Sequence, residues 1–267
     1  MQHAIFHSFI NNAIAVLQES PDMIGLAVAG SWITNETDAF SDLDLVLVST
    51  TKIADDSNQM KAIANQLGTV LSAFTGEHVG EPRLLICLYD KPLLHVDIKF
   101  LTPDKFHHRV ENPVVVWERN NQLTAIIEDT QSVWPYPDYQ WIEDRFWVWI
   151  HYATLKIGRG ELFEAFDFLG FLRMVVLGPL LHIKNGNQPR GVRKVETKLA
   201  TEDFEALTKT TSKLNAQDLV TALWKTIEVY ENLRTYLFDS TVEQKDEAAK
   251  AVKMYLKEIE TQTLARQ

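Results

Sequence analysis

The fold is decided by Ala27-Val-Ala-Gly-Ser-Trp32 and, a short spacer later, by Phe40-Ser-Asp-Leu-Asp-Leu-Val-Leu-Val48. The first stretch completes the apolar run Met23–Ala29, which predicts a buried strand that leads into a Gly-Ser turn. The second stretch predicts another strand, and alternate side chains of a strand face the same way. Asp42 and Asp44 are therefore expected on one face, with the leucines between and after them on the other.

Two carboxylates side by side repel each other, so a structure that holds them together needs a reason. A divalent cation is the usual one, because Mg²⁺ prefers oxygen ligands and often takes one or two carboxylates plus the phosphates of a substrate. Gly30 lets the backbone approach a phosphate closely, and Ser31 adds a hydroxyl and an N–H as donors. The pattern favours a metal and phosphate site over the alternative, a strand-edge turn with solvated carboxylates.

A third carboxylate lies in Leu94-His-Val-Asp-Ile-Lys-Phe100, which also predicts a strand. Asp97 shares the polar face of this strand with His95 and Lys99. If the strand lies beside 42–48, three carboxylates converge, and they could hold two metal ions, or one ion plus a base that takes a proton from a hydroxyl. The structural alternatives are that Asp97 pairs with Lys99 and that His95 is only a structural or surface histidine.

The remaining sequence divides into two parts. Trp134-Pro-Tyr-Pro137 predicts a stiff linker, so we expect one domain over 1–137 and a second over 138–267. Helical spacing of apolar residues and short apolar runs place the other elements. In the first domain these are helices over 4–17 and 56–74, strands over 83–88 and 93–101 joined by a turn at 89–92, and a candidate strand over 114–117; in the second they are helices over 140–157, 161–184, 201–212, 216–238 and 241–263.

The order of the motifs resembles a known family. A strand, Gly-Ser, a spacer, Ser-Asp-x-Asp-Leu and a distal strand Asp are typical of the DNA polymerase β-like nucleotidyltransferase superfamily, and the match covers residues 1 to about 100. The resemblance implies an α+β fold, with a mixed β-sheet and flanking helices in the catalytic domain, followed here by a C-terminal helical bundle.

The resemblance also implies a reaction and roles for the motif residues. A hydroxyl attacks the α-phosphorus of a nucleoside triphosphate and pyrophosphate leaves, helped by Mg²⁺. Asp42 and Asp44 would be metal ligands, and Asp97 would be a third metal ligand or the general base. Gly30 and Ser31 would hold the triphosphate.

The second half narrows the expected substrate. Arg159-Gly-Glu-Leu-Phe-Glu-Ala, with Leu172-Arg173 after it, is similar to the C-terminal part of bacterial aminoglycoside and lincosamide nucleotidyltransferases. This implies transfer of AMP from ATP to a hydroxyl of a small molecule, with an aminoglycoside-like antibiotic as the expected acceptor and resistance as the outcome. Related enzymes use a basic residue from this helical region on the triphosphate, which makes Lys156 a candidate; the alternative is a cation at a helix C-terminus.

Charge and composition exclude some classes of function. The 26 Lys and Arg against 36 Asp and Glu give a net charge of −10, which argues against broad electrostatic binding of nucleic acid and mildly favours cationic substrates. We expect a cytoplasmic protein without a membrane span, because Cys87 is the lone thiol and the sequence shows neither an export signal nor an apolar run of about 18–20 residues. The oligomeric state stays open.

Two other functions remain compatible with the same motifs. One is an adenylyltransferase that modifies a protein instead of a small molecule. The other is a nucleotide-binding, antitoxin-like module that binds a partner protein and turns nothing over. The presence of Asp42, Asp44 and Asp97 together argues against a decayed site, and therefore favours an enzyme.

Overall fold

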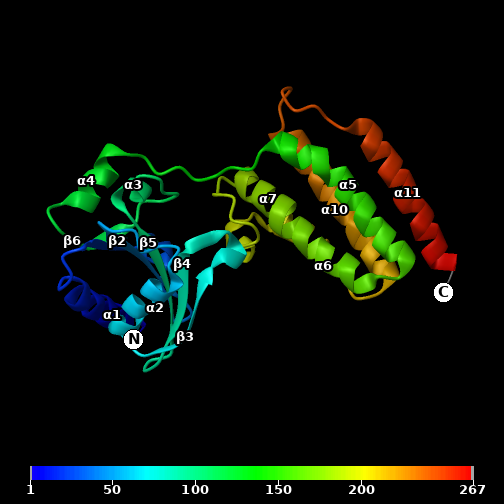
Figure 1. Ribbon diagram of the computed structural model, residues 1–267. Helices are drawn as coiled ribbons and strands as arrows, with labels where there is room; N and C mark the ends of the chain where they lie inside the picture. The colour runs from blue at the N-terminus through cyan, green and yellow to red at the C-terminus, as the bar shows by residue number, and fades with distance from the viewer. Residues whose placement is uncertain (1, 266–267) are drawn as a thin grey trace. The chain divides into compact units, whose positions relative to one another are not determined.

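The chain folds into two compact units. The computed structural model describes residues 2–265, and the division falls between Met1–Trp134 and Pro135–Gln267. We call the first the sheet unit and the second the helical unit, because Figure 1 shows strands only in the first. The boundary predicted after Pro137 lies three residues from this division.

The sheet unit is built on six strands in the order β3-β4-β5-β2-β1-β6. Neighbours β2 and β5 run parallel, whereas the other neighbouring pairs run antiparallel. The sheet is therefore mixed, and the predicted α+β class is confirmed. The strands are β1 (Met23–Val28), β2 (Leu43–Ser49), β3 (Val70–Gly76), β4 (Glu81–Tyr89), β5 (Leu94–Leu101) and β6 (Val114–Glu118).

Helices cover both faces of this sheet (Figure 1). On one face, α1 (Gln2–Leu17) and α2 (Ser57–Leu67) bury an apolar cluster that includes Leu45 and Ile98. On the other, α3 (Pro103–Phe106) and α4 (Gln122–Asp129) pack over a smaller cluster that includes Val46. Even-numbered residues of β2 thus face α3 and α4, as the predicted strand alternation requires.

One predicted element is partly wrong. The helix expected over 56–74 ends at Leu67, and Val70–Gly76 forms the edge strand β3, which pairs with β4. Gly68 interrupts the helix, since glycine is about 1 kcal/mol less favourable than alanine inside one. The β-branched and aromatic residues that follow favour a pleated strand. Leu71 is exposed on this strand.

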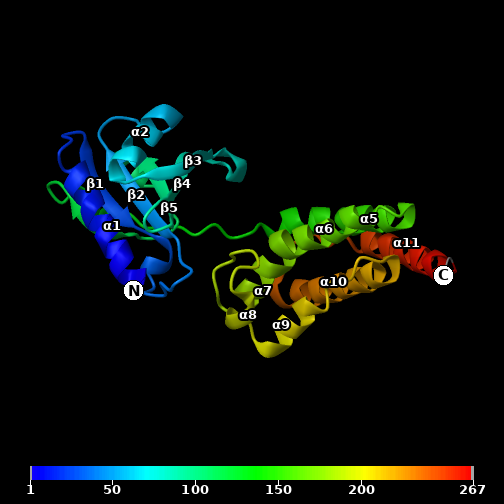
Figure 2. The same cartoon turned by 90° about the horizontal axis from the view of Figure 1, so that it is seen from below.

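The helical unit contains the predicted bundle. Asp138 begins its first long helix by accepting a hydrogen bond from the N–H of Trp141, and Gly160 ends that helix at a φ of +79°. Short helices α8 and α9 lie beside α7 in Figure 2. The elements are α5 (Tyr139–Arg159), α6 (Leu162–Leu172), a π-helical segment (Arg173–Leu177), α7 (Gly178–Lys184), α8 (Val195–Lys198), α9 (Thr201–Thr208), α10 (Ala216–Leu237) and α11 (Asp246–Ala265).

The segments α6 to α7 form one continuous apolar helix, Leu162–Lys184. Among the residues that the structure describes, this 23-residue helix is the one that is long and apolar enough to cross a membrane. The sequence patterns did not identify it as a candidate membrane span. Half of its most apolar window is buried within the protein, and Leu169 and Leu180 are core residues. Length and composition alone are weak evidence for a membrane span, because a core helix passes the same test.

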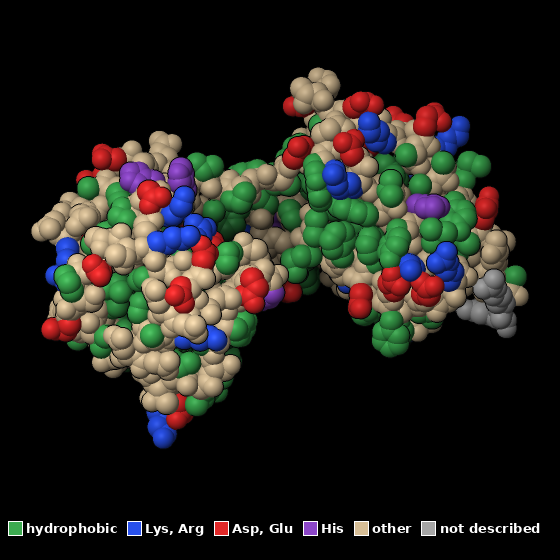
Figure 3. All heavy atoms as spheres, in the orientation of Figure 1, with side chains coloured by type: hydrophobic (Ala, Val, Ile, Leu, Met, Phe, Trp, Pro, Cys, Tyr) green, Lys and Arg blue, Asp and Glu red, His purple; other side chains and the backbone are tan. Residues whose placement is uncertain are grey.

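The helical unit also exposes apolar side chains. Val148, Phe163 and Phe171 of α5 and α6 are solvent-accessible, and Phe163 is 71% exposed. Figure 3 shows hydrophobic side chains gathered on one face of this unit. By contrast, Phe146 and Trp147 of α5 are fully buried.

Candidate functional site

The site begins with the register of the parallel strands β2 and β5. Asp44 of β2 is the direct partner of Asp97 of β5. Neighbouring strands lie about 4.8 Å apart, and paired residues project to the same face of a sheet. The two carboxylates therefore leave the sheet side by side, on the face opposite α1 and α2. The adjacency that the sequence argument required is present.

Asp42 lies just before β2, two residues from Asp44, and is half-buried. Its negative charge is near enough to act on Asp97. Burial raises the pKa of the Asp97 carboxyl above its ordinary value of 3.8; the charge and hydrogen bond of His95 oppose this rise, and the charge of Asp42 adds to it.

His95 has a structural contact with this cluster. Its Nε2 lies 3.0 Å from Oδ1 of Asp97, and its side chain is 52% exposed. The predicted alternative partner of Asp97, Lys99, instead pairs with Glu81, with 2.7 Å between Nζ and Oε2. Asp97 is therefore oriented by a histidine and not neutralised by the lysine two residues along its strand.

The Gly-Ser turn lies directly against Asp44. Gly30 begins the 3₁₀ turn Gly30–Trp32 after β1 and has a φ of +63°. A Cβ atom at this position would lie 1.9 Å from Oδ2 of Asp44, so only glycine fits beside the carboxylate. The N–H of Ala29 donates to the backbone oxygen of Asp44 at 2.9 Å, which fixes the turn to β2. The predicted neighbours Gly30, Ser31 and Asp44 are therefore brought together.

Sequence reasoning missed one acidic residue of this site. The N–H of Gly30 donates to Oε1 of Glu111 at 3.2 Å. Glu111 precedes β6, and the pairing of Val114 with Val28 places it beside the turn that follows β1. The pairing of β6 with β1 joins segments far apart in the chain, so no local signal could have placed Glu111.

The donor set suits Mg²⁺ chemically. All of the side chains concerned offer carboxylate oxygens, and Mg²⁺ commonly takes one or two carboxylates plus phosphate oxygens. Across residues 2–265, however, the structure holds no group of three or more His, Cys, Asp or Glu side chains already arranged around a metal position. The residues therefore fit a metal that arrives with phosphate ligands of its own better than a metal held by the protein alone.

Lys156 lies in α5 of the helical unit. Its Nζ lies 2.6 Å from Oε2 of Glu161 and 3.0 Å from Oε1 of Glu164. The hydrogen bonds that the Lys156 ammonium donates to Glu161 and Glu164 raise the pKa of Lys156 above its ordinary value. Its predicted contact with the triphosphate stays a prediction, and these two glutamates compete for the same ammonium.

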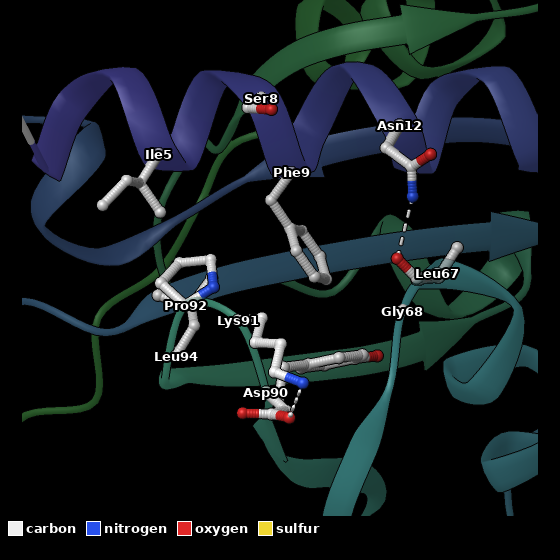
Figure 4. A pocket seen from close by; sticks show the side chains of 11 residues that line it. Ile5, Ser8, Phe9, Asn12, Leu67, Gly68, Asp90, Lys91, Pro92 and Leu94 are labelled. Carbon is white, nitrogen blue, oxygen red and sulfur yellow. Dashed lines mark hydrogen bonds and ion pairs between the residues drawn. The ribbon is translucent and has the colours of Figure 1, made fainter.

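A separate pocket opens on the other face of the sheet (Figure 4). It has a volume of about 280 Å³ and lies between α1, the end of α2 and the turn between β4 and β5. Phe9 and Asn12 line it, and Nδ2 of Asn12 donates to the backbone oxygen of Leu67 at 2.8 Å. Asp44 and Asp97 project from the opposite face, so this pocket is distinct from the carboxylate site.

Comparison with known proteins found no matching family model and no matching curated protein sequence. Among solved structures, the chain is similar to an aminoglycoside 6-adenyltransferase from Bacillus subtilis, with 13% identity, a TM-score of 0.38 and coverage of 94% of this chain and 97% of that one. It is also similar to a nucleotidyltransferase-like protein from Exiguobacterium sibiricum, with 11% identity, a TM-score of 0.38 and coverage of 97% and 91%.

A third similar structure is a spectinomycin adenyltransferase from Enterococcus faecialis, solved with ATP and spectinomycin, with 11% identity, a TM-score of 0.30 and coverage of 96% of this chain and 98% of that one. These structures are of the class that the sequence motifs resemble. Likenesses as distant as these carry no argument about the activity of this chain, which has to come from its own residues.

Proposed function

We propose that the protein is a Mg²⁺-dependent nucleotidyltransferase that moves AMP from ATP to a hydroxyl of a small molecule. The observation that carries the proposal is the register of Asp44 against Asp97, with Gly30 packed on the Asp44 carboxylate. Opposed carboxylates beside a turn that admits no side chain make room for a metal-bound phosphate. An aminoglycoside-like acceptor and a cytoplasmic location remain parts of this proposal.

The residues divide the work as follows. Asp42 and Asp44 would hold Mg²⁺, which neutralises phosphate charge when it is bound. Gly30 and Ser31 would donate to phosphate oxygens through their backbone N–H groups and the Ser31 hydroxyl. Asp97 would take the proton of the acceptor hydroxyl as its oxygen bonds to the α-phosphorus; the bond from that phosphorus to the bridging oxygen breaks, and pyrophosphate leaves.

Thermal unfolding with ATP, GTP, CTP and UTP, each with and without Mg²⁺, tests the binding half of this proposal. A ligand that binds only the native state raises its melting temperature by mass action. We expect a Mg²⁺-dependent rise with ATP that is lost in Asp44→Asn. The matched control is Asp129→Asn, an exposed carboxyl at the end of α4, which should keep the rise.

Release of pyrophosphate in the presence of amino-sugar antibiotics tests the transfer half. We expect release with at least one such acceptor, abolished in Asp42→Asn and Asp44→Asn. Labelling of a protein in a lysate by radioactive ATP would instead favour protein modification. A stoichiometric partner protein, with no pyrophosphate release from any acceptor, would favour the partner-binding module and overturn the proposal.

A further inference from the structure

Glu111 lies where the proposed nucleotide has to bind. It comes three residues before β6, and its half-buried side chain reaches the turn after β1. There Oε1 accepts the N–H of Gly30 at 3.2 Å. The Gly30 N–H is one of the donors that the proposed function assigns to a phosphate, so a carboxylate of the protein already occupies that position.

A phosphate oxygen and the Glu111 carboxylate cannot both take this N–H. The Asp44 carboxylate lies against the same glycine, so an anion at Gly30 meets a second negative charge there. The negative charges of the phosphate and of the half-buried Glu111 carboxylate would also repel each other strongly at this distance. Entry of the phosphate at Gly30 therefore requires the Glu111 side chain to leave.

The segment that carries Glu111 is anchored independently of Gly30. Arg109 donates to Oδ1 of Asn112 at 2.7 Å and to the backbone oxygen of Thr130 at 2.7 Å. It also donates to the backbone oxygen of Ile127 at 3.1 Å. These bonds join the side chains of Arg109 and Asn112, on either side of Glu111, and tie Arg109 to the end of α4. None of them depends on the Glu111 side chain, so they persist when that side chain rotates away from Gly30.

We propose that Glu111 is an internal anion that occupies the phosphate position at Gly30 in the free protein and is exchanged for a phosphate oxygen when a nucleoside triphosphate binds. The inference rests on the proposed function, because it takes the Gly30 turn as the phosphate site. Anions that make few other contacts with the protein would therefore not bind at Gly30, because only a ligand with enough additional contacts displaces the Glu111 carboxylate.

Titration calorimetry of the full chain with Mg²⁺·ATP and with inorganic triphosphate tests the exchange. If Glu111 holds the Gly30 N–H in about nine molecules of ten, the apparent Kd is about tenfold above the intrinsic one. We therefore expect Glu111→Ala to bind both ligands about tenfold more tightly than the natural protein. Glu111→Gln, which keeps an acceptor but loses the charge, should fall between the two.

The matched control is Glu19→Gln, which also removes one negative charge. Glu19 is exposed and lies before β1, at the opposite end of this strand from Gly30. We expect its Kd to equal that of the natural protein, which separates a local exchange from a general effect of net charge.

The outcomes separate this inference from the proposed function. If the natural protein and the Glu111 variants bind the ligands equally, the exchange is wrong and the proposed function stands. Weaker binding in both Glu111 variants would also overturn the exchange, because Glu111 would then contribute to the bound state. If no variant binds either ligand, the proposed function and the exchange fail together.

Discussion

Asp44 and Asp97 are direct partners across the parallel strands β2 and β5, and their carboxylates leave the same face of the sheet. The pairing places like charges within reach of each other, and Asp42 adds a third. Repulsion between these carboxylates destabilises the free protein, and a bound cation would stabilise it by neutralising their charge.

Asp97→Asn should stabilise the metal-free protein at neutral pH. Burial raises the native pKa of Asp97 above its ordinary 3.8, with Asp42 adding to the rise and His95 opposing it. When the pKa of a carboxyl is higher in the folded than in the unfolded protein, the ionised carboxylate destabilises the fold. The free energy of unfolding therefore falls as pH rises through that pKa. The melting temperature of Asp97→Asn in EDTA should therefore exceed that of the natural protein at pH 7, and the gap should shrink as pH falls toward 4. A variant that melts lower at pH 7 would contradict this.

Gly30→Ala should abolish nucleotide binding, whereas Gly80→Ala should not. Both glycines have positive φ, +63° and +76°, so alanine costs each site about 1–2 kcal/mol of backbone strain. At Gly80 nothing lies within 4 Å of the added Cβ, but at Gly30 it would meet Oδ2 of Asp44 at 1.9 Å. Thermal unfolding should show a small loss of stability in Gly80→Ala and a larger one in Gly30→Ala, where Asp44 must also shift, and the Mg²⁺·ATP shift should be lost only in Gly30→Ala. Retention of the shift in both variants would show that Asp44 adjusts freely.

Local patterns predicted most of the fold. The alternation in 42–48 placed Leu45 and Asp44 on opposite faces, and the buried core of β2 confirms it. Helical spacing found α1, α5 and α10 within two residues at most ends. The pattern failed at 68–74, where one face of a short amphipathic edge strand also satisfies helical spacing, and it did not find α4.

The candidate site was predictable only where its residues lie in strong local motifs. Gly30, Asp42 and Asp44 stand close together in the sequence, and Asp97 stands on a strand that a turn joins to its neighbour. Glu111 depends on the pairing of β6 with β1, and the two segments are separated by more than eighty residues. Contacts of that kind follow from tertiary packing and leave no periodic signal in the chain.

Glu81→Gln should weaken the sheet unit at neutral pH and lose its effect in acid. Glu81 lies 2.6 Å from Nε of Arg83 and 2.7 Å from Nζ of Lys99. Burial alone would raise the pKa of Glu81, but hydrogen bonds and charge from Arg83 and Lys99 lower it from 4.5 to about 2. The stabilisation is therefore complete above pH 4.5 and is lost as pH falls through about 2.

Urea unfolding measures this contribution. Hydrogen bonds to charged groups contribute about 1.5–3 kcal/mol each, partly offset here by desolvation of the carboxylate. We expect Glu81→Gln to lose about 1–3 kcal/mol at pH 7 and progressively less below pH 4.5. Glu128→Gln, an exposed carboxyl on α4, should be neutral throughout. A loss that stays constant between pH 7 and pH 3 would exclude the ionised carboxylate as its cause.

Glu143→Met should be the most damaging single change in the helical unit. Glu143 is fully buried in α5, where it accepts the hydroxyl of Tyr230, the N–H of Lys245 at 2.8 Å and the indole N–H of Trp147 at 3.3 Å. Nη1 of Arg234 lies 3.5 Å away and is also largely buried. Arg234 also pairs with Asp246, whose side chain is 75% exposed. Removing one partner of a buried ion pair costs about 3–5 kcal/mol, and in Glu143→Met the exposed Asp246 compensates the charge of Arg234 only in part.

The paired variant decides whether the charge of Arg234 is the cause. Glu143→Met combined with Arg234→Met removes both charges, so it should recover a large part of the loss, as apolar replacements of buried ion pairs often do. Asp144→Asn, at the neighbouring position but 44% exposed, should change the free energy of unfolding by less than about 1 kcal/mol. The measurement is urea unfolding followed by far-ultraviolet circular dichroism, which reports mainly the helices. A double variant as unstable as Glu143→Met would show that the cost comes from the lost hydrogen bonds to Tyr230 and Lys245 and not from the charge of Arg234.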